Sequence, residues 1–330
     1  MTERHRASRG GEEIPLGPAA EGVRPPWSAV PAEVVADIEE RLGAPIAEVV
    51  PRRAGFSPAV AAAVTSTRGD RVFVKIAGPD PNPTTPELYR QEAVIAAALP
   101  ASIPAPRLLW TYDAGGWVAL AFELVDGNNP TVPWHPEELT RVMDAVGALA
   151  MAGTPSPVTA PPFRSSVTHF ELIGWRSLHA GDGPVERLDP WARANLGALA
   201  ELESGVGAAA SGETLLHADL RADNILITRD RVVFVDWPWA CVGAAWVDLL
   251  AMLPSVAMQG GPAPETLFDV HPVSRGAPPA DVDAVLAALA GFFVFKGLQP
   301  DAPGLPTLRA FQRAQGKVAV AWLRRRLTGS

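Results

Sequence analysis

The sequence predicts an α+β fold with two unequal lobes, the first built on an antiparallel sheet and the second mainly helical. Strand-like runs gather in the first 125 residues, and helical periodicity dominates after residue 134. With 330 residues, the chain is long enough for two lobes and a sizeable core. We therefore expect a tail over residues 1–28, an N-lobe over 29–125 and a C-lobe over 126–330.

Composition narrows the class of protein. The net charge of −8 provides no basic footprint for nucleic acid or for an acidic membrane. A single cysteine, Cys241, excludes an internal disulfide framework and a Cys-rich zinc site. The first 22 residues contain no apolar core of a secretory signal, and residues 240–258 are interrupted by Asp248 and Pro254, which favours a buried helix over a membrane span. We expect a cytoplasmic protein with neither nucleic-acid nor membrane partners.

The N-lobe elements follow from periodicity and from turn residues. The tail is rich in Gly, Pro, Glu and Arg, which predicts disorder over residues 1–28. A helix begins near Pro31 and stops at Gly43. A second helix begins with Thr85 as its N-cap and Pro86 at its first position. Three strands are expected between the two helices, over residues 46–52, 59–66 and 71–77, the last two joined by a hairpin turn at 68–70.

Lys75 stands out in the third of these strands. The run alternates, so that Phe73 and Lys75 face one way and the valines between them face the other. A lysine among apolar neighbours is costly unless it is paired. Glu92 lies on the apolar stripe of the helix that follows, which makes it the available partner. We predict an inward-facing Lys75–Glu92 pair.

The C-lobe reads as a series of helices. Apolar residues recur at helical spacing over residues 137–152 and 196–206. A further apolar helix follows Trp246, and residues 259–280 form a Pro- and Gly-rich insertion. Two helices close the chain.

The segment between residues 214 and 238 holds most of the candidate catalytic and metal-binding residues. His217, Asp219 and Asn224 lie in a short loop between apolar runs, and Asp236 follows a strand-like run. The residues between Asn224 and Asp236 read as a β-hairpin, which brings the carboxylates before and after it to the same end. Two carboxylates and an amide at one place suit a divalent metal and a phosphate.

The spacing His217-x-Asp219-x₄-Asn224, followed by a strand that ends in Asp236, resembles the catalytic and metal-binding segments of the kinase superfamily. The His-Ala-Asp form looks like the aminoglycoside phosphotransferase family of small-molecule kinases. The resemblance implies a bilobal protein-kinase-like fold. It implies that Asp219 deprotonates the acceptor hydroxyl and that Asn224 and Asp236 hold Mg²⁺ on the phosphates of ATP. His217 would brace the loop.

The same resemblance extends to the N-lobe. Lys75 and Glu92 match the Lys–Glu pair that grips the nucleotide phosphates in kinases. The loop 53–58 lies where kinases place their phosphate loop, but it has one glycine instead of three. The aminoglycoside type also lacks the full motif. Backbone amides from Gly55 to Ser57 and the Ser57 hydroxyl are the expected phosphate ligands there.

Four further residues gain an expected role from the family. The strand that ends near residue 125 resembles the hinge between kinase lobes, so backbone groups near Glu123 and Val125 would bond the adenine edge. Phe73 replaces the small residue usual before the strand lysine, which implies a reshaped nucleotide roof. Asp248 would bond the backbone of the catalytic loop.

The resulting hypothesis is an ATP- and Mg²⁺-dependent transfer of the γ-phosphoryl group to a hydroxyl of a small molecule. The acceptor could be an aminoglycoside or another antibiotic, which would make this a resistance enzyme, or an amino alcohol or a sugar. A polycationic acceptor needs an acidic cleft, for which the second half of the chain offers Glu265, Asp269, Asp281 and Asp283.

Two alternatives remain open. One is a catalytically inactive kinase-like protein that only binds nucleotide. The other is a metal-dependent hydrolase with His217, Asp219 and Asp236 as ligands, which would need further ligands at suitable spacing.

Overall fold

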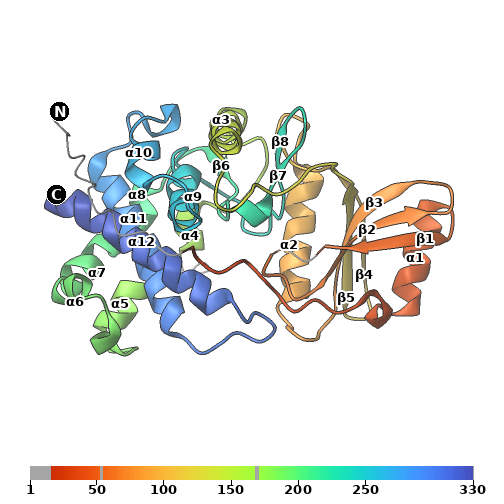
Figure 1. Ribbon diagram of the computed structural model, residues 1–330, viewed down its shortest axis with the longest axis horizontal. Coiled ribbons are helices and arrows are strands. Elements are labelled where there is room, and N and C mark those ends of the chain that lie inside the picture. Colours follow the sequence, from red (N-terminus) through yellow and green to blue (C-terminus); the bar gives the residue numbers. More distant parts are fainter. Residues whose placement is uncertain (1–15, 53–54, 168–170, 330) are drawn as a thin grey trace, which may run out of the picture.

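The computed structural model describes residues 16–329 except 53–54 and 168–170, and it has two unequal lobes (Figure 1). The smaller lobe holds a five-stranded antiparallel sheet in the order β1-β2-β3-β5-β4. Its strands are β1 (Ile46–Pro51), β2 (Val60–Ser66), β3 (Arg71–Ala77), β4 (Leu108–Ala114) and β5 (Trp117–Glu123), and its helices are α1 (Ala32–Leu42) and α2 (Thr85–Ala98).

The alternation of β3 assigns its two faces to different helices. Val72, Val74 and Ile76 share a core with Val34 and Ile38 of α1. Phe73 packs with the apolar residues of α2 on the opposite face, and Lys75, two residues further along, points the same way. The expected separation of Lys75 from the valines is therefore confirmed.

The larger lobe is mainly helical and surrounds two short antiparallel ladders. Its longer helices are α3 (Pro136–Ala152), α7 (Leu196–Ser204), α9 (Val247–Met258), α11 (Pro279–Leu298) and α12 (Leu308–Thr328). The shorter ones are α4 (Phe163–Ser166), α5 (Gly174–His179), α6 (Pro190–Ala194), α8 (Val206–Ala209) and α10 (Pro264–Phe268). The ladders pair β6 (Thr214–Leu216) with β9 (Cys241–Gly243), and β7 (Ile225–Ile227) with β8 (Val232–Phe234).

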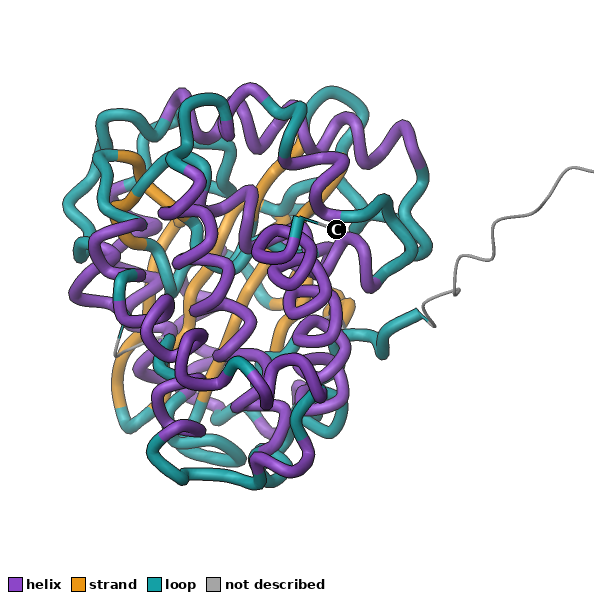
Figure 2. Tube along the Cα trace, turned by 90° about the vertical axis from the view of Figure 1, so that its left-hand side faces the viewer, coloured by secondary structure: helices purple, strands orange, loops and turns teal. Residues whose placement is uncertain are grey.

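One continuous apolar core holds the C-lobe together, and α9 lies within it with nearly all its residues buried. Figure 2 shows the helices of this lobe crowding in front of the sheet. Helix α11 packs against α12 and α5. The contact with α5 depends on glycine, because a Cβ built on Gly174 would lie 2.0 Å from the carbonyl oxygen of Gly291.

Two expectations for the first half of the chain differ from the structure. Helix α2 has Thr84, not Thr85, in the N-cap position, and no side-chain cap bond is formed there. Residues 16–28, expected to belong to a disordered tail, run along both lobes. The Gly17 amide donates to the Met258 carbonyl (3.0 Å), and the Val23 amide donates to the Gly304 carbonyl (2.7 Å). Residues 1–15 lie outside the described residues.

This N-terminal segment reaches the loop that follows β1. The Gly55 amide donates to the Ala20 carbonyl (3.1 Å), and the Arg24 guanidinium donates to the Ala59 carbonyl (3.0 Å). The segment therefore connects the C-lobe to the phosphate-loop position of the N-lobe. Within the described part of the chain, none of the helices has both the length and the apolar character needed to cross a membrane.

Candidate active site

The loop that opens with His217 is shaped by a buried carboxylate from α9. Asp248 accepts the backbone amides of His217 (2.7 Å) and Ala218 (2.8 Å), as the family resemblance implied. Ala218 has a φ of 62°, and Asp236 at the other end of the hairpin has a φ of 72°. Left-handed backbone at two non-glycine residues costs energy and persists only when its surroundings impose it. Asp248 supplies that restraint at Ala218.

His217 braces this loop from inside the protein. Its ring is buried, lies against the ring of Trp237 with centroids 4.6 Å apart, and bonds the Val235 carbonyl through Nε2 (2.9 Å). Its Nδ1 accepts the amide of Asp219 (3.2 Å). Burial lowers the pKa of His217 to about 4, so the ring is neutral at neutral pH.

Asp219 and Asn224 come together, as their spacing predicts. The Asn224 amide nitrogen donates to the backbone carbonyl of Asp219 (2.8 Å) and to its carboxylate (3.2 Å). Burial raises the pKa of Asp219 to about 7, although the guanidinium of Arg221 opposes that shift. A carboxylate with a pKa near neutrality is suited to exchange a proton with a substrate.

Arg221 was not among the predicted site residues, and it contacts two carboxylates of the loop. It donates to the carboxylate of Asp219 and makes a bidentate pair with Asp223 (2.9 and 3.1 Å). Its guanidinium also lies 5.4 Å from the ring centroid of Phe56. The residue sits inside the catalytic motif, at a position that the His-x-Asp-x₄-Asn pattern leaves variable, so the spacing alone gives no signal for it.

Lys75 joins the two lobes. Its ammonium donates to Glu92 (2.5 Å) and to Asp236 (2.6 Å), so the predicted pair is part of a three-residue cluster. Burial opposes the charge on Lys75, but the carboxylates of Asp236 and Glu92 outweigh that effect and raise its pKa. Burial also works against the charge of Asp236, and contact with Lys75 lowers the Asp236 pKa overall.

A cavity of about 230 Å³ lies between these residues and the sheet. It is lined by every residue that the sequence assigns to nucleotide or metal: Gly55, Ser57, Lys75, Glu92, Glu123, Val125, Asn224 and Asp236. Phe73, expected to reshape the roof of the nucleotide site, lines it too.

The loop between β1 and β2 borders this cavity, although Arg53 and Ala54 lie outside the described residues. Gly55 has a φ of 94°, which favours glycine, and a Cβ there would lie 3.3 Å from the Arg24 guanidinium. The Ser57 hydroxyl bonds the hydroxyl of Tyr89 (2.9 Å). Arg24 itself lines the cavity, and no sequence motif singled it out.

The expected hinge borders the same cavity through residues 122–125. The amide of Glu123 donates to the Arg107 carbonyl (2.9 Å), and its carboxylate pairs with Arg231 (3.4 Å). The Glu123 amide is therefore already engaged and is not available to a nucleobase in this cavity. Glu123 lies at the end of β5, so the sheet fixes its position.

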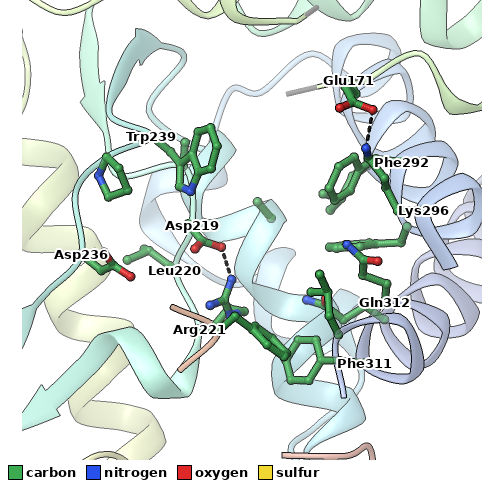
Figure 3. A pocket seen from close by; sticks show the side chains of 18 of the residues that line it. Glu171, Asp219, Leu220, Arg221, Asp236, Trp239, Phe292, Lys296, Phe311 and Gln312 are labelled. Carbon is green, nitrogen blue, oxygen red and sulfur yellow. Dashed lines mark hydrogen bonds and ion pairs between the residues drawn. The ribbon is translucent and has the colours of Figure 1, made fainter. Parts of the chain in front are cut away.

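A second, larger cavity of about 420 Å³ adjoins the first and reaches from Asp219 to α11 and α12 (Figure 3). Ser57, Phe56 and Asp236 line both cavities, and the carboxylate of Asp219 faces the larger one. The larger cavity is the candidate acceptor site, since it begins at the predicted base.

The four carboxylates that the sequence offered for an acidic acceptor cleft lie elsewhere. Glu265, Asp269, Asp281 and Asp283 do not line the larger cavity. Glu265 is paired with Arg325 (2.6 Å) and Asp283 with Arg326 (2.5 Å), at the end of α12. These carboxylates therefore hold the last helix in place. Lys296, paired with Glu171, lines the cavity and was not predicted, because α11 reads as an ordinary apolar helix.

The hydrolase alternative finds no support in the side chains. Among residues 16–329 without the two gaps, no three His, Cys, Asp or Glu side chains gather closely enough to hold a metal ion by themselves. A hydrolase site built on His217, Asp219 and Asp236 would need such a group. A metal bound here would depend on oxygens from a ligand.

Comparison with known proteins agrees with this geometry. The family model described as "Phosphotransferase enzyme family" matches residues 48–269, more than half of the chain. A search of curated proteins finds no match by sequence.

Solved structures give the same fold at low sequence identity. A thermostable mutant of aminoglycoside phosphotransferase APH(4)-Ia, in ternary complex with AMP-PNP and hygromycin B, has a TM-score of 0.57 at 15% identity, covering 89% of this chain and 98% of that one. Choline kinase LicA from Streptococcus pneumoniae also scores 0.57 at 15% identity, with 88% and 98% covered. A choline/ethanolamine kinase family protein from Mesorhizobium loti scores 0.57 at 17% identity, with 90% and 97% covered. The fold is kinase-like.

Proposed function

The chain belongs to the phosphotransferase enzyme family, and we propose that it transfers the γ-phosphoryl group of ATP to a hydroxyl of a small molecule, with Asp219 as the base. One observation carries the proposal. The cavity lined by Lys75 and Asn224 meets the larger cavity that begins at Asp219, and Asp236 lines both. A donor bound in one cavity and an acceptor bound in the other would meet beside these carboxylates.

Each residue has a defined task in this reaction. Asp219 accepts the proton of the acceptor hydroxyl. The hydroxyl oxygen of the acceptor then forms a bond to the γ-phosphorus, and the bond from that phosphorus to the oxygen of the β-phosphate breaks. Lys75, held by Glu92, neutralises phosphate charge. His217 is neutral and enclosed, so it positions the loop and takes no part in proton transfer.

The residues beside the phosphate position fit Mg²⁺. Asn224 uses its amide nitrogen for Asp219, so its oxygen is the atom it can offer to a cation. Asp236 adds a carboxylate at the same cavity, and oxygen donors are the ligands that hard cations prefer. Bound there, Mg²⁺ would neutralise the charge on the phosphate oxygens.

The proposal is tested by mass spectrometry of reactions that contain the protein, Mg·ATP and a pooled panel of hydroxyl-bearing antibiotics, sugars and amino alcohols. We expect one panel member to gain a single phosphate together with a stoichiometric amount of ADP. Asp236→Asn should stop this transfer, because it removes a carboxylate from the metal position. A protein that binds Mg·ATP and releases phosphate to water equally with and without every acceptor would contradict the proposal.

A further inference from the structure

The larger cavity also carries information about the acceptor. Its walls come from segments far apart in the sequence: the loop that follows β8, the first half of α9, and the facing sides of α11 and α12 (Figure 3). Apolar side chains make up most of the lining, among them Phe163, Trp239, Leu250, Leu289, Phe292 and Phe311. A ligand that fills the cavity would therefore bury mainly apolar surface.

Each carboxylate among the described residues of this cavity already has a protein cation as a partner, although Lys75 is shared with Glu92 and Arg221 with Asp223. The three carboxylates among the described lining residues are Glu171, Asp219 and Asp236. Glu171 is paired with Lys296, Asp219 with Arg221, and Asp236 with Lys75. A cationic acceptor would therefore meet, among the described lining residues, no carboxylate that lacks a protein cation beside it.

The geometry of the cations adds to this argument. Arg221 and Lys296 lie on opposite sides of the cavity, and each is held by a carboxylate of its own side (Figure 3). The aromatic walls could attract a quaternary ammonium, but the volume of about 420 Å³ far exceeds such a group. The neutral polar groups of α12, Gln312 and Gln315, suit hydroxyl or carbonyl groups of an uncharged ligand.

We propose that the acceptor is an uncharged alcohol with a bulky, mainly apolar ring body, which packs on Trp239, Leu289 and Phe292 and presents one hydroxyl to Asp219. This inference rests on the proposed phosphoryl transfer and specifies its acceptor. It replaces the acidic cleft expected from the sequence, and it separates this site from one built for a polycation.

The first test measures ligand binding in the larger cavity and does not depend on catalysis. Nile red, an uncharged dye whose emission rises and shifts to the blue in apolar surroundings, is titrated into the protein. We expect saturable binding that uncharged polycyclic and macrocyclic alcohols displace. Leu289→Asp should weaken dye binding by at least about tenfold, since it places a carboxylate in the apolar wall. Val270→Asp is the matched control, because Val270 is 70% exposed and lies outside the cavity.

Phe292→Ala provides a second variant that introduces no charge, and it should weaken dye binding in the same direction. Near-ultraviolet circular dichroism establishes that both variants are folded. Binding that is absent, or equal in Leu289→Asp and Val270→Asp, would overturn the inference about the acceptor.

The second test measures transfer. Uncharged polycyclic and macrocyclic alcohols are compared with choline, glucose and hygromycin B by kcat/KM at saturating Mg·ATP. We expect the best uncharged ring-bearing alcohol to exceed each of the three by at least about tenfold, and Leu289→Asp to remove that preference. Preferred phosphorylation of choline or hygromycin B would overturn the inference and leave the proposed function standing. Displaceable dye binding without transfer to any acceptor would support the apolar site and contradict the proposed function.

Discussion

Arg221 donates a hydrogen bond to the carboxylate of Asp219, the residue proposed to receive the acceptor proton. The same guanidinium holds both oxygens of Asp223, so it is anchored independently of Asp219. A base that is paired with a cation is a weaker proton acceptor, while burial acts in the opposite direction and raises the Asp219 pKa to about 7. Arg221 therefore tunes the base, and this relationship leads to the first prediction.

Replacing Arg221 with methionine removes the cation that stabilises the charged form of Asp219. We expect the acidic limb of the pH–rate profile to move to higher pH, because the carboxylate then takes up a proton more readily. The measurement is kcat/KM for the acceptor as a function of pH. Arg221→Lys should partly restore the position of the limb, and Arg231→Met, at a side chain 57% exposed, should leave it unchanged.

The unsubstituted protein should itself lose activity in acid. Asp219 must be ionised to accept a proton, and its pKa of about 7 places the change near neutrality. The expected kcat/KM for the acceptor falls about tenfold per pH unit below about pH 7 and levels off above it. His217 cannot produce this limb, because its pKa is about 4. A profile that is flat between about pH 5.5 and 8.5 would contradict the assignment of the base.

Lys75 should affect stability as well as nucleotide binding. Lys75→Met leaves Glu92 and Asp236 without their shared cation, and breaking a buried pair in this way typically costs about 3–5 kcal/mol. We expect a lower midpoint in urea unfolding and a large loss of affinity for Mg·ATP by calorimetry. Lys317→Met is the matched control, since that lysine is exposed on α12. Equal nucleotide affinity in the two variants would exclude Lys75 from the phosphate site.

Asp248 is predicted to act on the loop without touching substrate. Asp248→Ala leaves the amides of His217 and Ala218 without their acceptor. Each buried donor left unsatisfied costs about 1–3 kcal/mol of folding free energy. Urea unfolding should show this cost, and kcat should fall while the KM for ATP changes little. Asp144→Ala, on an exposed part of α3, should change neither the free energy of unfolding nor kcat. An unchanged free energy of unfolding would show that the loop holds its left-handed residue by other means.

Local spacing predicted much of the site. The motif from His217 to Asn224 and the hairpin up to Asp236 are contiguous, and the pairing of β7 with β8 brings their ends together. The alternation of β3 and the apolar stripe of α2 were sufficient to predict that Lys75 contacts Glu92, although 17 residues separate them. In each case, the periodicity of one element determined the direction of the side chain.

The acceptor cavity could not be predicted in this way, because it is formed by packing between distant helices. Lys296 on α11 meets Glu171 from a loop 125 residues earlier in the chain, and no local pattern marks either residue. Acidic residues in and after the insertion were candidates for an acidic acceptor cleft, but Glu265 and Asp283 pair with the arginines of α12. Arg24 lies in a segment whose composition predicts disorder, so the sequence did not indicate it as a site residue.

The central claim is that Asp219 accepts the acceptor proton in phosphoryl transfer from ATP, and Asp219→Asn tests it most directly. The asparagine keeps the shape of the side chain but cannot take up the proton. For the best acceptor found, we expect kcat to fall by at least about 10²-fold while the calorimetric affinity for Mg·ATP stays within about twofold. A variant that phosphorylates the acceptor at the unsubstituted rate would contradict the account.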